Sequence, residues 1–243
     1  MTIEELRTEA NRLYCEEATP EAITQARDLC LKAAEYKDVV SAVLLAGIVC
    51  DTCDYDEAKR WWSQAFDWYK ANPTDEATDV VASAHARYAD MLFFNYEELD
   101  PVPASYRHSA FDHYSEAIAM GCTDCRAPLG LLLYEGNWKP NSEPDIYAAL
   151  KIWKEGMDDG NHECAFHYCT HFVRTGKSDQ SIVDTLEALV RDDLDPYADA
   201  CALLYQHYSR TGDDDLAADW LECGLDMYSD MCENIVNEER GEA

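Results

Sequence analysis

The chain has 243 residues, of which 47% are hydrophobic, so it can bury a sizeable core and is too apolar for a disordered protein. Its 49 acidic and 19 basic residues give a formal charge of -30, which repels nucleic-acid phosphates and anionic lipid surfaces. We therefore expect no direct binding to nucleic acid or to membranes. If charge selects a partner, that partner is basic.

The sequence indicates a cytoplasmic protein. Its longest apolar run, VVSAVLLAGIVC, falls short of the roughly 18 to 20 residues that a membrane-spanning helix needs, and the first ten residues, MTIEELRTEA, are acidic. Eleven cysteines without a secretory signal favour reduced thiols over a disulfide framework, and an odd number cannot pair completely.

A repeated helical pattern is the strongest feature. A small residue is followed four positions later by a large or apolar one, and three positions after that by another small or apolar one, which marks one stripe of a helix. The pattern occurs at Ala26, Cys30, Ala33; Ala58, Trp62, Ala65; Ala110, Tyr114, Ala117; Ala149, Trp153, Gly156; Ile182, Leu186, Leu189; and Ala217, Leu221, Gly224. We call these segments the B helices. Before each lies a second apolar segment, the A helix, with its alanine at Ala10, Ala42, Ala86, Ala127, Ala165 or Ala200.

Most neighbouring segments are 16 to 18 residues apart, so one pair occupies about 34 residues. A helical hairpin of this length buries its apolar faces only by stacking on its neighbours. The sequence therefore predicts an all-α solenoid of about six helix pairs with a capping helix at the carboxyl end. The expected units of this single domain, 1–243, are 3–34, 38–70, 79–120, 124–160, 162–192 and 196–228, with the cap at 229–243.

Three longer connections interrupt the regular spacing, and each contains proline, which breaks a helix. They are KANPTDEATD at 70–79, NYEELDPVPASY at 95–106 and NWKPNSEPD at 137–145. The third holds Trp138, which either binds a ligand or folds back over the repeats. The tryptophans on B helices are expected to fill the core, and these are Trp61, Trp62, Trp153 and Trp220.

Residues 127–165 resemble a Sel-one-like repeat (SLR), a relative of the tetratricopeptide repeat. The matching residues are Ala127, Leu129, Gly130, Tyr134, Gly136, Asp145, Ala149, Trp153 and Gly160. Segments 54–65 and 213–224 keep the second helix of the pattern, while four units lack its leucine-glycine position and fit a plain tetratricopeptide hairpin equally well. The resemblance implies a right-handed superhelix of antiparallel helix pairs. It also implies an adaptor, without a cofactor, whose A helices line a concave face that grips a peptide or a helix of another protein.

The segment HECAFHYCTH, at 162–171, raises the alternative of a metal-binding protein or a metal-dependent enzyme. Cys164, His167 and His171 share one stripe of the fifth A helix, and zinc accepts thiolate and imidazole ligands. However, the two histidines occupy positions that hold leucine, isoleucine or tyrosine in other units. We therefore favour packing or groove lining and expect no metal site.

Two CxxC pairs, Cys50 with Cys53 and Cys122 with Cys125, suggest a shared zinc site. The repeat places the pairs at opposite edges of the solenoid, about 18 Å apart, which is too far for thiolates that share one ion. Each pair alone could be redox-active, although packing at helix ends is the simpler interpretation.

No serine nucleophile elbow, glycine-rich phosphate loop or Walker motif supports an enzyme. The main hypothesis is a non-enzymatic protein–protein interaction scaffold. Its candidate partner-binding residues carry hydrogen-bonding or aromatic groups at atypical A-helix positions, namely Arg87, Tyr88, Arg126, His167, His171 and Gln206. A further alternative is an acidic nucleic-acid mimic that binds a basic protein.

Overall fold

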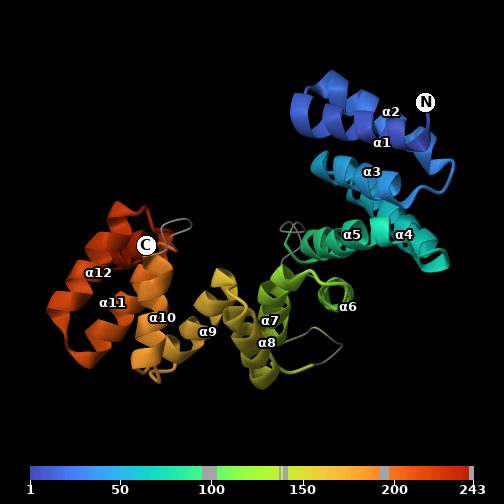
Figure 1. Ribbon diagram of the computed structural model, residues 1–243. Helices are drawn as coiled ribbons and strands as arrows, with labels where there is room; N and C mark the ends of the chain where they lie inside the picture. Colours follow the sequence, from blue (N-terminus) through green and yellow to red (C-terminus); the bar gives the residue numbers. More distant parts are fainter. Residues whose placement is uncertain (95–102, 137, 139–141, 192–196, 241–243) are drawn as a thin grey trace. The chain divides into compact units, whose positions relative to one another are not determined.

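The computed structural model describes residues 1–94, 103–136, 138, 142–191 and 197–240, and every regular element among them is helical (Figure 1). The all-α prediction is confirmed. The chain divides into two compact units, Met1–Asp145 and Ile146–Ala243. The assignment of the whole chain to a single domain stays a prediction.

The described part of the first unit contains α1 (Ile3–Arg12), α2 (Pro20–Ala34), α3 (Val39–Asp51), α4 (Tyr55–Ala71), α5 (Asp75–Phe93), α6 (Ala104–Ala119) and α7 (Arg126–Glu135). A π-helical segment, Leu13–Glu17, follows α1, and a 3-10 turn, Thr123–Cys125, precedes α7. Consecutive helices pack as pairs, α1 on α2, α3 on α4 and α5 on α6. The A helices also contact one another, because α3 packs against both α1 and α5.

The described part of the second unit contains α8 (Ile146–Asp158), α9 (His162–Arg174), α10 (Gln180–Val190), α11 (Ala200–Thr211), α12 (Asp214–Asp226) and α13 (Asp230–Arg240). Here α9 packs on α10 and α11 on α12, while α13 contacts both helices of the last pair, as predicted for a cap. Three of the six predicted helix pairs lie in the first unit and two lie in the second. The fourth pair, α7 with α8, is divided between the two units.

Many of the acidic residues at the turns begin helices. The side chains of Asp38, Asp54, Asp179 and Asp213 each accept a hydrogen bond from the backbone amide three residues later. These bonds start α3, α4, α10 and α12. The first turn of a helix leaves such amides without partners, so each cap contributes about 1 kcal/mol. Part of the acidic charge therefore has a structural role.

The predicted B-helix stripe forms the core. In α4, Ala58, Trp62 and Ala65 are at most 1% exposed, and the equivalent residues of α2, α6 and α8 are buried as well. Alanine lets neighbouring helices approach closely, and the large residue between two alanines fills the space that remains. Trp62 and Trp153 are fully buried, whereas Trp61 and Trp220 are only partly buried.

The predicted register of the third A helix was wrong. Ala86 is partly exposed, while Ala82 and Ala89 are buried in α5. The reason is the connection before this helix, which we expected to be a proline-containing insertion over 70–79. Only residues 72–74 separate α4 from α5, and the acidic segment after them forms the first turn of α5. The second expected insertion falls largely on residues outside the described part of the chain.

Trp138 folds back on its own unit. Its ring stacks on Phe111 of α6, with centroids 4.5 Å apart. Gly136 ends α7 with φ at 79°, and a Cβ there would lie 2.9 Å from the backbone nitrogen of Pro144, so only glycine fits this turn. The amide of Asp145 then donates to the carbonyl of Leu133 at 2.8 Å, which returns the loop to α7.

None of the helices that the structure describes combines the length and the apolar character needed to cross a bilayer.

Candidate protein-interaction groove

The A helices of the first unit line a groove of about 810 Å³, which we call the A-helix groove. Its walls come from α1, α3 and α5, the three helices that pack side by side. The lining residues are Glu4, Arg7, Thr8, Asn11, Arg12, Glu16, Val40, Val43, Leu44, Glu76, Asp79, Val80, Ser83, Ala84 and Arg87. The apolar part includes Val40, Val43, Leu44 and Val80, all of which remain partly exposed. The groove therefore presents unburied apolar surface along α3 and α5.

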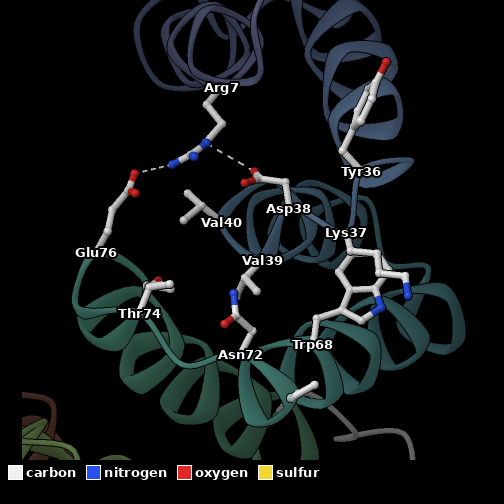
Figure 2. Close-up of a pocket in the computed structure, with 12 residues that line it drawn as sticks. Arg7, Tyr36, Lys37, Asp38, Val39, Val40, Trp68, Asn72, Thr74 and Glu76 are labelled. Carbon is white, nitrogen blue, oxygen red and sulfur yellow. Dashed lines mark hydrogen bonds and ion pairs between the residues drawn. The ribbon is translucent and has the colours of Figure 1, made fainter.

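Arg7 lies between this groove and a smaller pocket of about 390 Å³, because it lines both. Its Nε atom is 3.2 Å from a carboxylate oxygen of Asp38, and its Nη1 atom pairs with Glu76 (Figure 2). Lys37 and Trp68 lie on the side of the pocket away from Arg7. Two carboxylates thus neutralise the charge of Arg7 before any ligand arrives.

Arg12 and Arg87 are paired in the same way. Arg12 contacts Glu9 at 2.6 Å and Glu17 at 2.5 Å. The Nη2 atom of Arg87 lies 3.0 Å from Asp51 of α3. All three arginines of the A-helix groove are therefore bound to carboxylates of the protein itself.

Tyr14, in the π-helical segment after α1, helps to hold Arg87 in place. Its hydroxyl donates a hydrogen bond to Asp51, the residue that holds Arg87. Burial, reinforced by this carboxylate, raises the pKa of Tyr14 to about 12. The phenol therefore stays protonated at neutral pH and keeps its role as a donor.

The remaining carboxylates in the groove lining form no ion pair with a basic side chain of the described residues. Glu4, Glu16 and Asp79 are exposed and form no ion pair with the described part of the chain. Because the arginines are already paired, the charge that the A-helix groove offers to a ligand is negative.

Gly47 of α3 makes room for Arg87. A Cβ at this position would lie 2.7 Å from the Nη1 atom of Arg87, and all three of its nearest atoms belong to that side chain. We expect Gly47→Ala to leave stability unchanged or raise it by up to about 1 kcal/mol. Alanine favours the helix by about 1 kcal/mol, while displacing Arg87 costs one exposed ion pair, worth about 0–1 kcal/mol.

Urea unfolding measures this change, and Gly47→Ala in an Arg87→Ala background is its control. With the arginine gone, the full gain of about 1 kcal/mol should appear. A loss of more than about 1 kcal/mol in either background would show that the space above Gly47 is needed for another reason.

Two other predicted residues of the first unit lie outside the groove. Tyr88 packs among aromatic side chains of α4 and α6, with ring centroids 5.3 Å from Trp62, 6.1 Å from Phe66 and 4.5 Å from His113. Arg126 is partly buried at the first turn of α7. The sequence therefore identified one lining residue of this groove, Arg87, among its six candidates.

The remaining candidates, His167, His171 and Gln206, are partly exposed on α9 and α11 of the second unit. The ring of His167 stacks on Trp153 of α8, with centroids 5.2 Å apart and an angle of 21° between the ring planes. Burial, together with the charge of Lys177, lowers the pKa of His171, so this side chain is neutral at neutral pH.

Cys164 does not share a surface with these histidines, because it is fully buried. Within the described residues, no group of three or more histidine, cysteine, aspartate or glutamate side chains could hold a metal ion. The expectation that Cys164, His167 and His171 bind no metal stays a prediction.

No protein-family model and no curated protein matches the chain. A crystal structure of a Sel1 repeat protein from Oxalobacter formigenes matches with a TM-score of 0.64 and 16% identity, over 93% of this chain and 88% of that one. A second match is c5321, a protective antigen of uropathogenic Escherichia coli strains that displays an SLR fold, with a TM-score of 0.69 and 18% identity. It covers 99% of this chain, which spans half the length of the antigen. The chain has the SLR fold.

Most residues that line the A-helix groove were not among the candidates from the sequence. Arg7 is a charged residue on an A helix just as Arg87 is, but it was not among the candidates, and Leu44 occupies a position that is ordinary for packing between helices. Only the contacts of α3 with α1 and α5 bring them together. The partial exposure of Leu44 would have identified it as a groove residue, but this exposure depends on which neighbours cover α3.

Proposed function

We propose that the protein is a non-enzymatic interaction scaffold whose A-helix groove binds a basic amphipathic helix from a partner protein. The observation that carries this proposal is an apolar stripe left open on α3. Val40 and Leu44 are one turn apart and partly exposed, and Val43 lies beside them. A helix that docks in a groove presents apolar side chains at such intervals, so it would cover this stripe.

Charge supports a basic partner. Glu4, Glu16 and Asp79 offer unbalanced carboxylates, and the arginines between them are already paired. The charge of -30 also attracts a cationic helix before contact and raises the rate of association. An acidic helix would meet repulsion at both stages.

The alternative of a nucleic-acid mimic gains less support. A mimic needs carboxylates free to meet a basic surface, whereas several aspartates at the turns are engaged as helix caps by backbone amides. We retain the cytoplasm as the expected compartment, because eleven cysteines favour a reducing one.

Fluorescence anisotropy with synthetic peptides tests the proposal. The probes are two amphipathic helices of about 14 residues with leucine on one face and either lysine or glutamate on the other. We expect the lysine peptide to bind at least about tenfold more tightly. Leu44→Asn should weaken its binding by about tenfold, because the stripe loses its largest apolar side chain while the charge is unchanged.

Leu31→Asn is the matched control, since Leu31 is 36% exposed on α2 and lies outside the groove. It should leave the affinity unchanged, with both variants folded by circular dichroism. Equal affinity for the two peptides, or equal loss in the two variants, would contradict the proposal.

A further inference from the structure

The CxxC pair at the start of α7 brings two thiols together. The sulfur atoms of Cys122 and Cys125 are 3.7 Å apart. Cys122 caps a 3-10 turn, Thr123–Cys125, that ends at Cys125. With a rise of about 2 Å per residue, this turn places α-carbons three positions apart at about 6 Å. A disulfide spans α-carbons about 4.4–6.8 Å apart, so the backbone already suits one.

The two thiols differ in access to solvent. Cys125 is 4% exposed, whereas Cys122 is only partly buried. Burial, followed by the neighbouring Cys122 and the carboxylates of Asp90 and Asp124, raises the pKa of the Cys125 thiol. Cys125 therefore stays protonated at neutral pH, and Cys122 is the thiol that a reagent in solution reaches first.

We propose that Cys122 and Cys125 are a redox-active pair that forms a reversible intramolecular disulfide by exchange with a low-molecular-weight disulfide. The thiolate of Cys122 attacks one sulfur of the oxidant, forms a mixed disulfide and releases the first thiolate of the oxidant. Cys125 then loses its proton and attacks the sulfur of Cys122, and the second thiolate leaves. The released thiolates take up the two protons lost by the protein, so the oxidant becomes two thiols while the protein loses two hydrogens.

The second CxxC pair of the same unit provides an internal comparison. Cys50 is buried near the end of α3, and Cys53 follows that helix with φ at 62°, in the left-handed region. The chain leaves the helix between these two residues, and Cys53 is exposed. The spacing in the sequence is the same, and the amide of Cys53 donates to the carbonyl of Cys50 at 2.8 Å. In the described structure, however, the sulfur atoms of this pair form no contact like the one between Cys122 and Cys125.

The experiment equilibrates the full chain in buffers with increasing ratios of oxidised to reduced glutathione, alkylates the remaining thiols and digests with trypsin. Peptide 108–126 contains only Cys122 and Cys125, and peptide 38–59 contains only Cys50 and Cys53. Formation of the disulfide in peptide 108–126 appears as a loss of two hydrogens and resistance to alkylation. We expect it at a ratio of oxidised to reduced glutathione at least about tenfold lower than the ratio that oxidises peptide 38–59. Dithiothreitol should restore both thiols.

Serine variants separate the two steps. In Cys125→Ser, glutathione should remain bound to Cys122, because the attacking thiol is gone. Cys122→Ser should abolish oxidation of 108–126, whereas Cys53→Ser should leave it unchanged. Two results would overturn the proposal: wild-type 108–126 accumulating glutathione instead of closing, or staying reduced where 38–59 is oxidised.

Discussion

Replacing Trp62 with alanine should destabilise the first unit by about 3–5 kcal/mol, the cost typical of removing a buried aromatic side chain. The ring is 1% exposed and stacks on Tyr88 of α5, so its loss leaves a cavity between two helix pairs that rigid neighbours cannot close. Urea unfolding followed by circular dichroism should show the loss in the transition of this unit.

The adjacent tryptophan provides a matched control. Trp61 is only partly buried, and its indole nitrogen donates to Glu57 at 3.3 Å on the surface of α4. Trp61→Ala removes the same number of atoms from the same helix but should cost about 1 kcal/mol. Equal losses in the two variants would mean that the repeat stripe is not what holds the helix pairs together.

Stability should fall in acid because of a half-buried histidine pair. The Nδ1 atoms of His85 and His113 are 2.7 Å apart, so the N–H of one ring donates a hydrogen bond to the other ring, and Phe66 stacks on His85 at 3.9 Å. Burial lowers the pKa of each histidine to about 4, and the charge of His85 adds to this for His113. The unfolded chain, with a histidine pKa of about 6.5, therefore binds more protons between these values.

Because the unfolded chain binds more protons, the stability of the fold decreases as the pH falls. The contribution of the pair to stability is complete above about pH 6.5 and is lost as the pH falls towards 4. One pKa unit corresponds to about 1.4 kcal/mol, and partial exposure of both rings reduces the total, so we expect a loss of about 2–4 kcal/mol. Unfolding free energies measured between pH 7 and pH 4 test this.

Carboxylates also contribute to acid unfolding, so the comparison must be made against a variant. His85→Phe with His113→Phe removes both titrating groups and keeps rings that can stack on Phe66. Its stability should depend less on pH over the same range. A pH dependence identical to that of the wild type would show that the histidines do not contribute.

Periodicity predicted most of the core because it repeats. Trp62, Tyr114 and Trp153 occupy the same place in successive B helices, and all three are buried. The third A helix failed because α5 has many alanines, and a pattern based on small residues cannot choose among them. The spacing from Ala86 to Ala58 and to Ala110 is longer than the common step of 16 to 18 residues, so the repeat did not fix its register. Burial depends on where α5 begins, which the short connection at residues 72–74 determined.

The candidate groove was harder to predict, because its members belong to three helices far apart in the sequence. Arg7 and Leu44 become neighbours of Arg87 only through the packing of α3 against α1 and α5. The position of Trp138 was equally hard to predict, because its ring contacts Phe111 from a segment that lies outside the repeat pattern. Sequence patterns specify which face of a helix is buried, but contacts between repeats decide which exposed residues share a surface.

Hydrogen–deuterium exchange of the full chain, with and without the leucine–lysine peptide, tests the central claim most directly. The account predicts slower exchange in α1, α3 and α5, whose side chains line the A-helix groove, and no change in α9 and α11 of the second unit. Slower exchange confined to α9 and α11, or spread evenly over all helices, would contradict it, because the peptide would then bind elsewhere or only through overall charge.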